Sequence, residues 1–160
     1  MERLWAPWRL EYIQAPDHDG CIFCLEQSRT RDAEKLVLTR GESCVVMMNR
    51  YPYTNGHLLL APCRHLGDPA QLTNNEVLEL HHWLVDSQTV LRQTFAAEAF
   101  NVGWNFGAAA GAGIAAHIHM HVVPRWAGDH NFMPVLADIR VIPEHLERTY
   151  EQLVTAFADL

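Results

Sequence analysis

Apolar residues concentrate in short segments of the chain whose pattern is typical of β-strands. The first segment, 43–48, is apolar and rich in β-branched residues, and the residues of 49–56 that follow it include proline, asparagine and glycine, which favour turns. A second segment, 57–61, ends at Pro62. We therefore expect 43–48 and 57–61 to pair as an antiparallel hairpin with a long loop.

A long amphipathic helix is predicted after this hairpin, with Thr73 as its N-cap. Its apolar residues recur at helical spacing and are Val77, Leu80, Leu84, Val85, Leu91 and Phe95. Two further strands are expected at 100–105 and 115–123, the latter ended by Pro124. This order of strands, helix and strands indicates an α+β domain built on an antiparallel sheet.

Composition narrows the class of protein. With 160 residues, of which 49% are apolar and 19% are charged, the chain is expected to fold as one domain, 1–160. The net charge of -7 offers no basic surface for a long nucleic acid, so a phosphate-bearing ligand must be held by a few local donors. No apolar run approaches the roughly 20 residues that span a bilayer. The first residues also lack the pattern of a signal peptide, which predicts a cytoplasmic protein without a membrane partner.

Three histidines alternate with apolar residues in the predicted last strand. His117, His119 and His121 would share one face of a strand, while Ile118 and Met120 would face the core. With a rise of about 3.3 Å per residue, neighbouring imidazoles lie roughly 7 Å apart at the backbone and can address successive atoms of one ligand. The alternative is a metal site, because a His-x-His pair can chelate one ion.

The run 117–123 matches the signature His-φ-His-φ-His-φ-φ, where φ is apolar, and resembles the histidine triad (HIT) family. The resemblance extends upstream to 46–50 and 53–59 and downstream to 123–129, and it covers about residues 20–130. It implies a HIT-like fold, with an antiparallel sheet of about five strands, one long helix and a shorter one.

The terminal stretches refine this resemblance. The N-terminal arm 5–9 (WAPWR) and the segment 131–135 of the C-terminal extension resemble the bacterial members that act on diadenosine tetraphosphate, including the phosphorylases. The implied function is a hydrolase or nucleotidyltransferase that cleaves dinucleoside polyphosphates at the α-phosphate. Whether water or phosphate is the acceptor is left open by the residues.

The resemblance also implies catalytic roles. His119 would attack the α-phosphorus and form a nucleotidyl-histidine, which divides one difficult displacement into two easier ones. His121 would lie near the phosphate oxygens, and the backbone carbonyl near His117 would orient the other ring nitrogen of His119. His57, beside the nucleoside pocket, is a further candidate for the catalytic group.

Nucleotide-binding candidates come from the same comparison. Asn49 stands where the family binds the ribose hydroxyls. The other candidates are Met47, Leu59, Asn105, Gly111, Gly113 and Trp126. Asn105 and the backbone amides of the small-residue loop 107–113 are candidates to stabilise charge on the phosphorus in the transition state. Taken without the family, Asn49 is equally well explained as a turn residue, and the loop as a plain flexible one.

Cys21 and Cys24 have the C-x-x-C spacing of zinc ligands, but a tetrahedral zinc needs two more donors. The resemblance supplies His65 and His117, which complete such a site in several family members and in the related galactose-1-phosphate uridylyltransferases. A closed set of two cysteines and two histidines implies a structural zinc, and no organic cofactor is expected.

Other interpretations of the cysteines stay open. Cys21 and Cys24 could simply be reduced and buried, and Cys63 is an alternative to His65 as a ligand. Cys44 lies in a predicted strand, where we expect it to pack in the core. In a reducing compartment none of them is expected to form a disulfide.

A homodimer is expected because Trp5, Trp8 and the long helix after Thr73 offer more apolar surface than so small a domain readily hides, and because the resemblance implies one. Two other functions compete with the nucleotidyl-histidine enzyme. One is a hydrolase in which triad histidines hold a catalytic zinc, and the other is a nucleotide-binding sensor without catalysis. The intact triad argues against the sensor.

Overall fold

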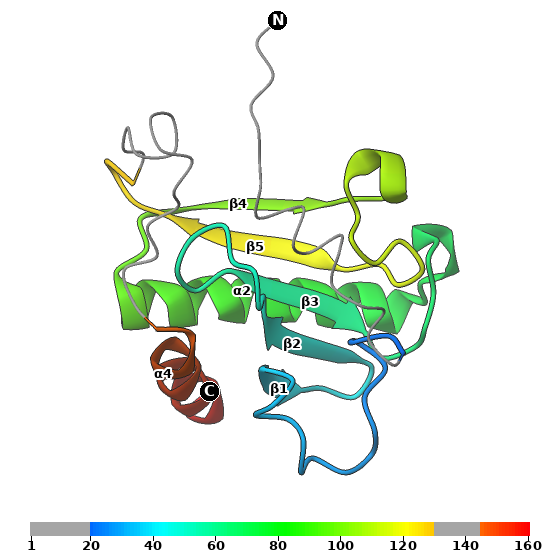
Figure 1. Cartoon of the computed structure of the whole chain (residues 1–160), viewed down its shortest axis with the longest axis horizontal. Coiled ribbons are helices and arrows are strands. Elements are labelled where there is room, and N and C mark those ends of the chain that lie inside the picture. The colour runs from blue at the N-terminus through cyan, green and yellow to red at the C-terminus, as the bar shows by residue number, and fades with distance from the viewer. Residues whose placement is uncertain (1–19, 130–144) are drawn as a thin grey trace, which may run out of the picture.

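The computed structural model describes residues 20–129 and 145–160. The predicted aromatic arm 5–9 and the segment 131–135 lie outside these residues. Figure 1 shows the arrangement of the elements, which in chain order are β1 (Val37–Arg40), β2 (Cys44–Met48), β3 (Leu58–Pro62), η1 (Pro69–Gln71), α2 (Asn74–Phe95), β4 (Ala99–Trp104), η2 (Ala108–Ala110), β5 (Met120–Arg125) and α4 (Leu146–Ala158).

The strands form one sheet of five in the order β1-β2-β3-β5-β4, and every neighbouring pair is antiparallel. The predicted hairpin is confirmed, since β2 and β3 pair from Cys44 opposite Pro62 to Met48 opposite Leu58. The sheet, the long α2 and the shorter α4 confirm the α+β class. The edge strand β1 was not located by the hydrophobic pattern, because it has only four residues and two of them are half-buried.

The bounds expected for the last strand are wrong at both ends. Strand β5 begins at Met120 rather than Ala115, and it continues through Pro124 to Arg125. Its pairing with both neighbours begins at Met120, opposite Leu60 of β3 and opposite Trp104 of β4. Since β3 pairs with β5 only as far as Val122, a proline at 124 interrupts no hydrogen bond with β3. His117 and His119 therefore precede the strand instead of lying within it.

Helix α2 begins as predicted. Thr73 is its N-cap, and a capping box links the Thr73 side chain to the backbone of Glu76 and the Glu76 carboxylate to the backbone of Thr73. The helix ends at Ala96 in the left-handed conformation. Two of the apolar residues at helical spacing do not face the core, because the side chains of Val77 and Val85 are each 50% exposed.

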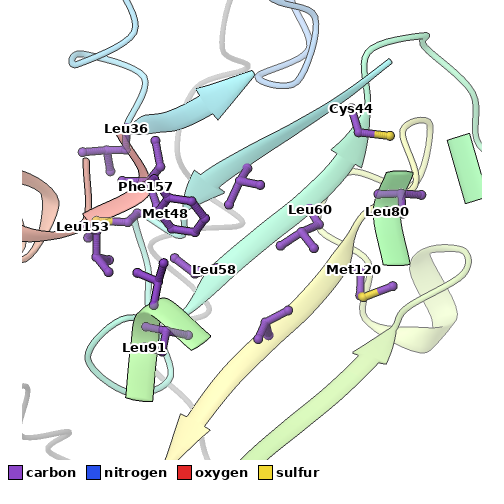
Figure 2. Packing of buried hydrophobic residues seen from close by; sticks show 14 of the residues in the cluster. Leu36, Cys44, Met48, Leu58, Leu60, Leu80, Leu91, Met120, Leu153 and Phe157 are labelled. Atoms are coloured by element: carbon purple, nitrogen blue, oxygen red, sulfur yellow. The ribbon is translucent and has the colours of Figure 1, made fainter. Parts of the chain in front are cut away.

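A large apolar core lies between the sheet and the two helices. Alternate residues of the strands point into it, including Cys44 as expected, together with Leu80 and Leu91 of α2 and Leu153 and Phe157 of α4. Figure 2 shows these side chains converging between β2, β3, β5 and the helices. In the view of Figure 1, α2 runs behind the sheet and α4 lies at the β1 end. None of the helices in the described part of the chain has the length and apolar character to cross a membrane.

Candidate active site

The face of the sheet opposite α2 carries a second, smaller apolar cluster and the imidazoles. Successive residues of a strand point to opposite faces. In β3, Leu58 and Leu60 join the large core, whereas Leu59 and Ala61 join the smaller cluster. His121 lies opposite Leu59 in the register and alternates with core residues of β5, so its imidazole is on the same face as Leu59.

His119 has the environment of a neutral nucleophile. Its side chain is 5% exposed, and its Nδ1–H donates to the backbone carbonyl oxygen of His117 at 2.9 Å. Burial lowers the pKa of His119 below its usual value, although the hydrogen bond to His117 acts in the opposite direction. With its proton on Nδ1, the ring presents the lone pair of Nε2 for attack. The carbonyl orientation expected for His119 is therefore present.

His121 presents the same ring nitrogen, Nε2, in the opposite protonation state. The backbone N–H of Tyr53 donates to Nδ1 of His57 at 3.1 Å, so His57 carries its proton on Nε2. That Nε2–H donates to Nδ1 of His121 at 3.0 Å, which leaves the proton of His121 on its own Nε2. This Nε2 is buried and has no hydrogen-bond partner among the described residues. Burial and then the neighbouring His119 lower the pKa of His121 to about 4, so the ring is neutral near pH 7.

The two rings face each other closely enough to act on one group. The centroids of His119 and His121 are 5.0 Å apart in an edge-to-face arrangement. One ring offers a lone pair and the other an N–H donor, which are groups able to attack a phosphorus and to donate a hydrogen bond to the oxygen that leaves.

A group of four possible metal ligands, here called the metal group, lies beside His119. One ligand atom from each of Cys21, Cys24, His65 and His117 lies within 4.8 Å of all the others. The Sγ of Cys21 is 3.2 Å from Nδ1 of His117, and the Sγ of Cys24 is 3.3 Å from Nδ1 of His65. Ligands at the usual zinc distances of about 2.0–2.3 Å and at tetrahedral angles are separated by about 3.5 Å, so the donor set fits zinc.

The surroundings of His117 also fit a ligand. Its ring is fully buried, and its Nε2–H donates to the carbonyl oxygen of Pro62 at 2.8 Å, which leaves Nδ1 facing the cysteines. A hydrogen bond of this kind from the other ring nitrogen is typical of histidines that bind metals. The group of close donors includes His65 and not Cys63, the alternative ligand.

Comparison with known proteins identifies the family. The family model for the HIT domain matches residues 30–128, which is more than half of the chain. The chain belongs to the HIT family. The resemblance inferred from the histidine signature is thereby confirmed.

Among relatives of this HIT protein, the AP-4-A phosphorylase of Mycobacterium tuberculosis is 36% identical over 166 aligned residues, which cover 99% of this chain and 85% of the relative. The asymmetrical bis(5'-nucleosyl)-tetraphosphatase of Schizosaccharomyces pombe is 31% identical over 93 residues, 58% of this chain and 50% of the relative. A zinc-bound histidine triad family protein from Mycobacterium smegmatis superposes with a TM-score of 0.62 at 26% identity, covering 78% of this chain and 84% of that one.

The candidate nucleotide-binding residues of the HIT protein fall in different places. Met47 and Leu59 are buried in the smaller cluster on the imidazole face. The Oδ1 of Asn49 accepts the backbone N–H of Tyr51 at 2.9 Å, and its Nδ2 is 3.3 Å from Nδ1 of His57. Asn49 therefore holds the turn after β2 and also contacts the histidine pair.

The remaining candidates are more peripheral. Asn105 is half-buried directly after β4, Gly113 is exposed, and Gly111 ends η2 at a φ of 86°. Trp126 packs against the large core on the α2 side, and its Nε1–H donates to the carbonyl oxygen of Phe95 at 2.9 Å. The structure thus does not bring Trp126 together with the imidazoles.

Sequence reasoning missed two residues that contact the histidines. Tyr53 fixes the proton of His57 through its backbone N–H, and its ring centroid is 4.6 Å from that of His57. Phe23 is 1% exposed and stacks on His119, with ring centroids 4.9 Å apart and an interplanar angle of 29°. A backbone donor leaves no signal in a sequence, whereas Phe23 stands conspicuously between the two cysteines of the metal group.

Proposed function

We propose that this HIT protein is an enzyme that cleaves dinucleoside polyphosphates, of the diadenosine tetraphosphate type, through a nucleotidyl intermediate on His119. The observation that carries the proposal is the pair of opposite tautomers, with Nε2 of His119 unprotonated and Nε2 of His121 protonated. The names of the Mycobacterium tuberculosis and Schizosaccharomyces pombe relatives support the substrate class.

In the first step the lone pair of His119 Nε2 forms a bond to the α-phosphorus, and the bond from that phosphorus to the bridging oxygen breaks. The leaving oxygen departs as a polyphosphate anion, and the Nε2–H of His121 stabilises its charge as a hydrogen-bond donor without transferring the proton. The acceptor molecule enters in the second step. There the acceptor oxygen attacks the phosphorus, the P–N bond breaks, and His119 is regenerated neutral.

The nucleotide is proposed to lie along the imidazole face. Met47 and Leu59 supply apolar surface for the nucleoside, and Asn49 is the candidate for the ribose hydroxyls once its amide turns from Nδ1 of His57. Asn105 and the backbone amides of loop 107–113 remain the candidates for the phosphate oxygens. Hydrogen-bond donors that are already oriented toward developing charge lower the barrier without the reorganisation that water requires.

Phosphate is the acceptor that we favour, because the relative with 36% identity, aligned over 99% of this chain, is named a phosphorylase. Incubation with diadenosine tetraphosphate, with and without phosphate, followed by product analysis tests this choice. Phosphorolysis gives ADP and ATP and requires phosphate. Asymmetric hydrolysis gives AMP and ATP, and symmetric hydrolysis gives two ADP, so either result without phosphate dependence would overturn the choice of acceptor.

A structural zinc is proposed at Cys21, Cys24, His65 and His117. It would tie the N-terminal turn to the segment that carries the nucleophile. Four protein donors fill a tetrahedral ion, and His119 and His121 are not among them, so this set does not favour the alternative of a catalytic zinc with an open position for water.

The homodimer also remains a proposal, and the edge of the sheet supports it. Strand β4 ends the sheet on one side, and four of its six residues are exposed. Val102 in this strand is 42% exposed and Phe106 just beyond it is 47% exposed. An exposed apolar edge strand favours pairing with another strand.

A further inference from the structure

The proposed nucleophile lies at the very end of the sheet. Strand β5 begins at Met120, so His119 directly precedes the first residue that pairs with β3 and β4. Nearby, the backbone N–H of Ile118 donates to the carbonyl oxygen of Leu66 at 2.8 Å. This bond anchors the backbone, but it does not determine the orientation of the imidazole.

Three contacts define the position of the imidazole. The hydrogen bond from Nδ1 to the His117 carbonyl fixes one edge of the ring, and His121 makes an edge-to-face contact with it. A hydrogen bond to one atom still allows the ring plane to tilt. The third contact, the stacked ring of Phe23, is the one that covers a face of the imidazole.

Phe23 is itself held firmly. It is 1% exposed within the smaller apolar cluster, and its ring centroid is also 5.1 Å from that of His117. It stands between Cys21 and Cys24, whose backbones are joined by a hydrogen bond from Cys24 N–H to Cys21 O at 3.1 Å. The position of the aromatic ring is therefore tied to the two cysteines on either side of it.

We propose that Phe23 is a positioning residue for His119, and that the turn 21–24 and its metal ligands hold the phenyl ring against the nucleophile. This inference rests on the proposed function, because it assigns to His119 the role of nucleophile. Under this proposal the metal group affects catalysis through Phe23, without any contact between metal and substrate. A loss of the turn would release the imidazole from one side and allow it to leave the line of attack.

The test compares Phe23→Leu with Phe157→Leu. Phe157 is also buried, at 5% exposure, but it lies on α4 in the large core on the other side of the sheet. Both variants lose a buried ring, so Phe157→Leu serves as a control for a general loss of packing. Melting temperature and metal content are measured for both, together with nucleotide binding.

In a single turnover with labelled diadenosine tetraphosphate, we expect Phe23→Leu to form the nucleotidyl-enzyme about tenfold to a hundredfold more slowly than wild type. Its nucleotide affinity and metal content should stay within about twofold of wild type, and Phe157→Leu should keep the wild-type rate. Equal rates for the two variants would overturn the proposal. A loss of metal in Phe23→Leu alone would also overturn it, because the effect would then come from the ligand set.

Nitrogen-15 NMR of the imidazoles gives a readout that does not depend on turnover. Wild type should show His119 as a single tautomer with its proton on Nδ1, and both Phe23→Leu and Cys24→Ser should show averaged or shifted ring signals. Unchanged signals in Cys24→Ser would overturn the link to the turn. If wild type formed no labelled protein at all, the proposed function would fail, while the NMR comparison would still decide whether Phe23 positions the ring.

Discussion

The Nδ1–H of His119 donates to the backbone carbonyl oxygen of His117 at 2.9 Å, and this one bond leaves Nε2 of the proposed nucleophile unprotonated. Both ring nitrogens of His117 have other contacts, because Nδ1 faces Cys21 and Nε2–H donates to the carbonyl oxygen of Pro62. His117 thus contacts the metal group through its ring and His119 through its backbone carbonyl.

His57 is expected to act through His121. Replacing His57 with Ala removes the donor that keeps the proton of His121 on Nε2, so we expect the rate of the chemical step to fall by about tenfold to a hundredfold. Nucleotide affinity should change by less than about threefold. His82→Ala is the matched control, because His82 is exposed on α2. A His57→Ala enzyme as fast as His82→Ala would show that the histidine pair has no role in the chemical step.

Metal binding should distinguish the cysteines. We expect about one zinc per chain in protein purified without chelators, and Cys24→Ser should lose most of it and melt at a lower temperature. Cys63→Ser is the control, since Cys63 lies outside the group of close donors and should retain the metal. Elemental analysis checks both variants. Wild-type protein without metal, or a Cys63→Ser variant that loses it, would contradict the proposed ligand set.

The Glu76 carboxylate is expected to contribute to stability in a pH-dependent way. It is 2% exposed, and its hydrogen bond with Arg64 lowers its pKa to about 2, against the opposing effect of burial. Because the folded pKa lies below the unfolded one near 4.5, this stability is present above pH 4.5 and is lost as the pH falls toward 2.

Glu76→Gln should therefore lower the free energy of unfolding by about 2 kcal/mol near pH 7, since it weakens both the capping box and the bond to Arg64. Urea denaturation at several pH values measures this difference, which should shrink below pH 4.5. Glu98→Gln, at an exposed position, is the control and should change little. A difference that stayed constant down to pH 3 would contradict this role.

Light scattering at micromolar concentration tests the proposed dimer, which should have about twice the chain mass of 18.2 kDa. Placing a charge on the exposed edge strand in Val102→Asp should shift the protein toward the monomer. Val77→Asp, at an exposed position of α2, is the control. If the wild type were monomeric, the proposed dimer would be wrong. If the Val102→Asp variant remained dimeric, the interface would lie elsewhere than on β4.

Much of the fold could be predicted because local signals were strong. Thr73 with Glu76 three residues later marked the start of α2, and the apolar runs on either side of the turn at 49–56 marked β2 and β3. The start of β5 could not be read in the same way. Alternation of histidine with apolar residues continues through 117–119, but a strand requires paired neighbours, and the pairing of β5 with β3 and with β4 begins only at Met120.

The histidines that the structure brings together could be predicted from the sequence, whereas the residues that contact and orient them could not. The spacing of His119 and His121 pointed to them directly, and the family resemblance suggested His65 as a partner of the cysteines. The backbone donor at Tyr53 and the stacked ring of Phe23 depend on chain segments that meet only in the folded protein. Trp126 was a reasonable candidate from its motif, yet its indole N–H bonds to the end of α2 on the other side of the sheet.

The central claim is a covalent intermediate on His119, and rapid acid-free quenching of wild type mixed with α-labelled diadenosine tetraphosphate tests it most directly. We expect label on the protein that is stable to base and labile to acid, as for a phosphoramidate, and located by peptide mapping at His119. His119→Ala should trap none and lose turnover by several orders of magnitude, while its nucleotide affinity stays nearly intact. Substantial turnover by His119→Ala, or label trapped on it as readily as on wild type, would contradict the account.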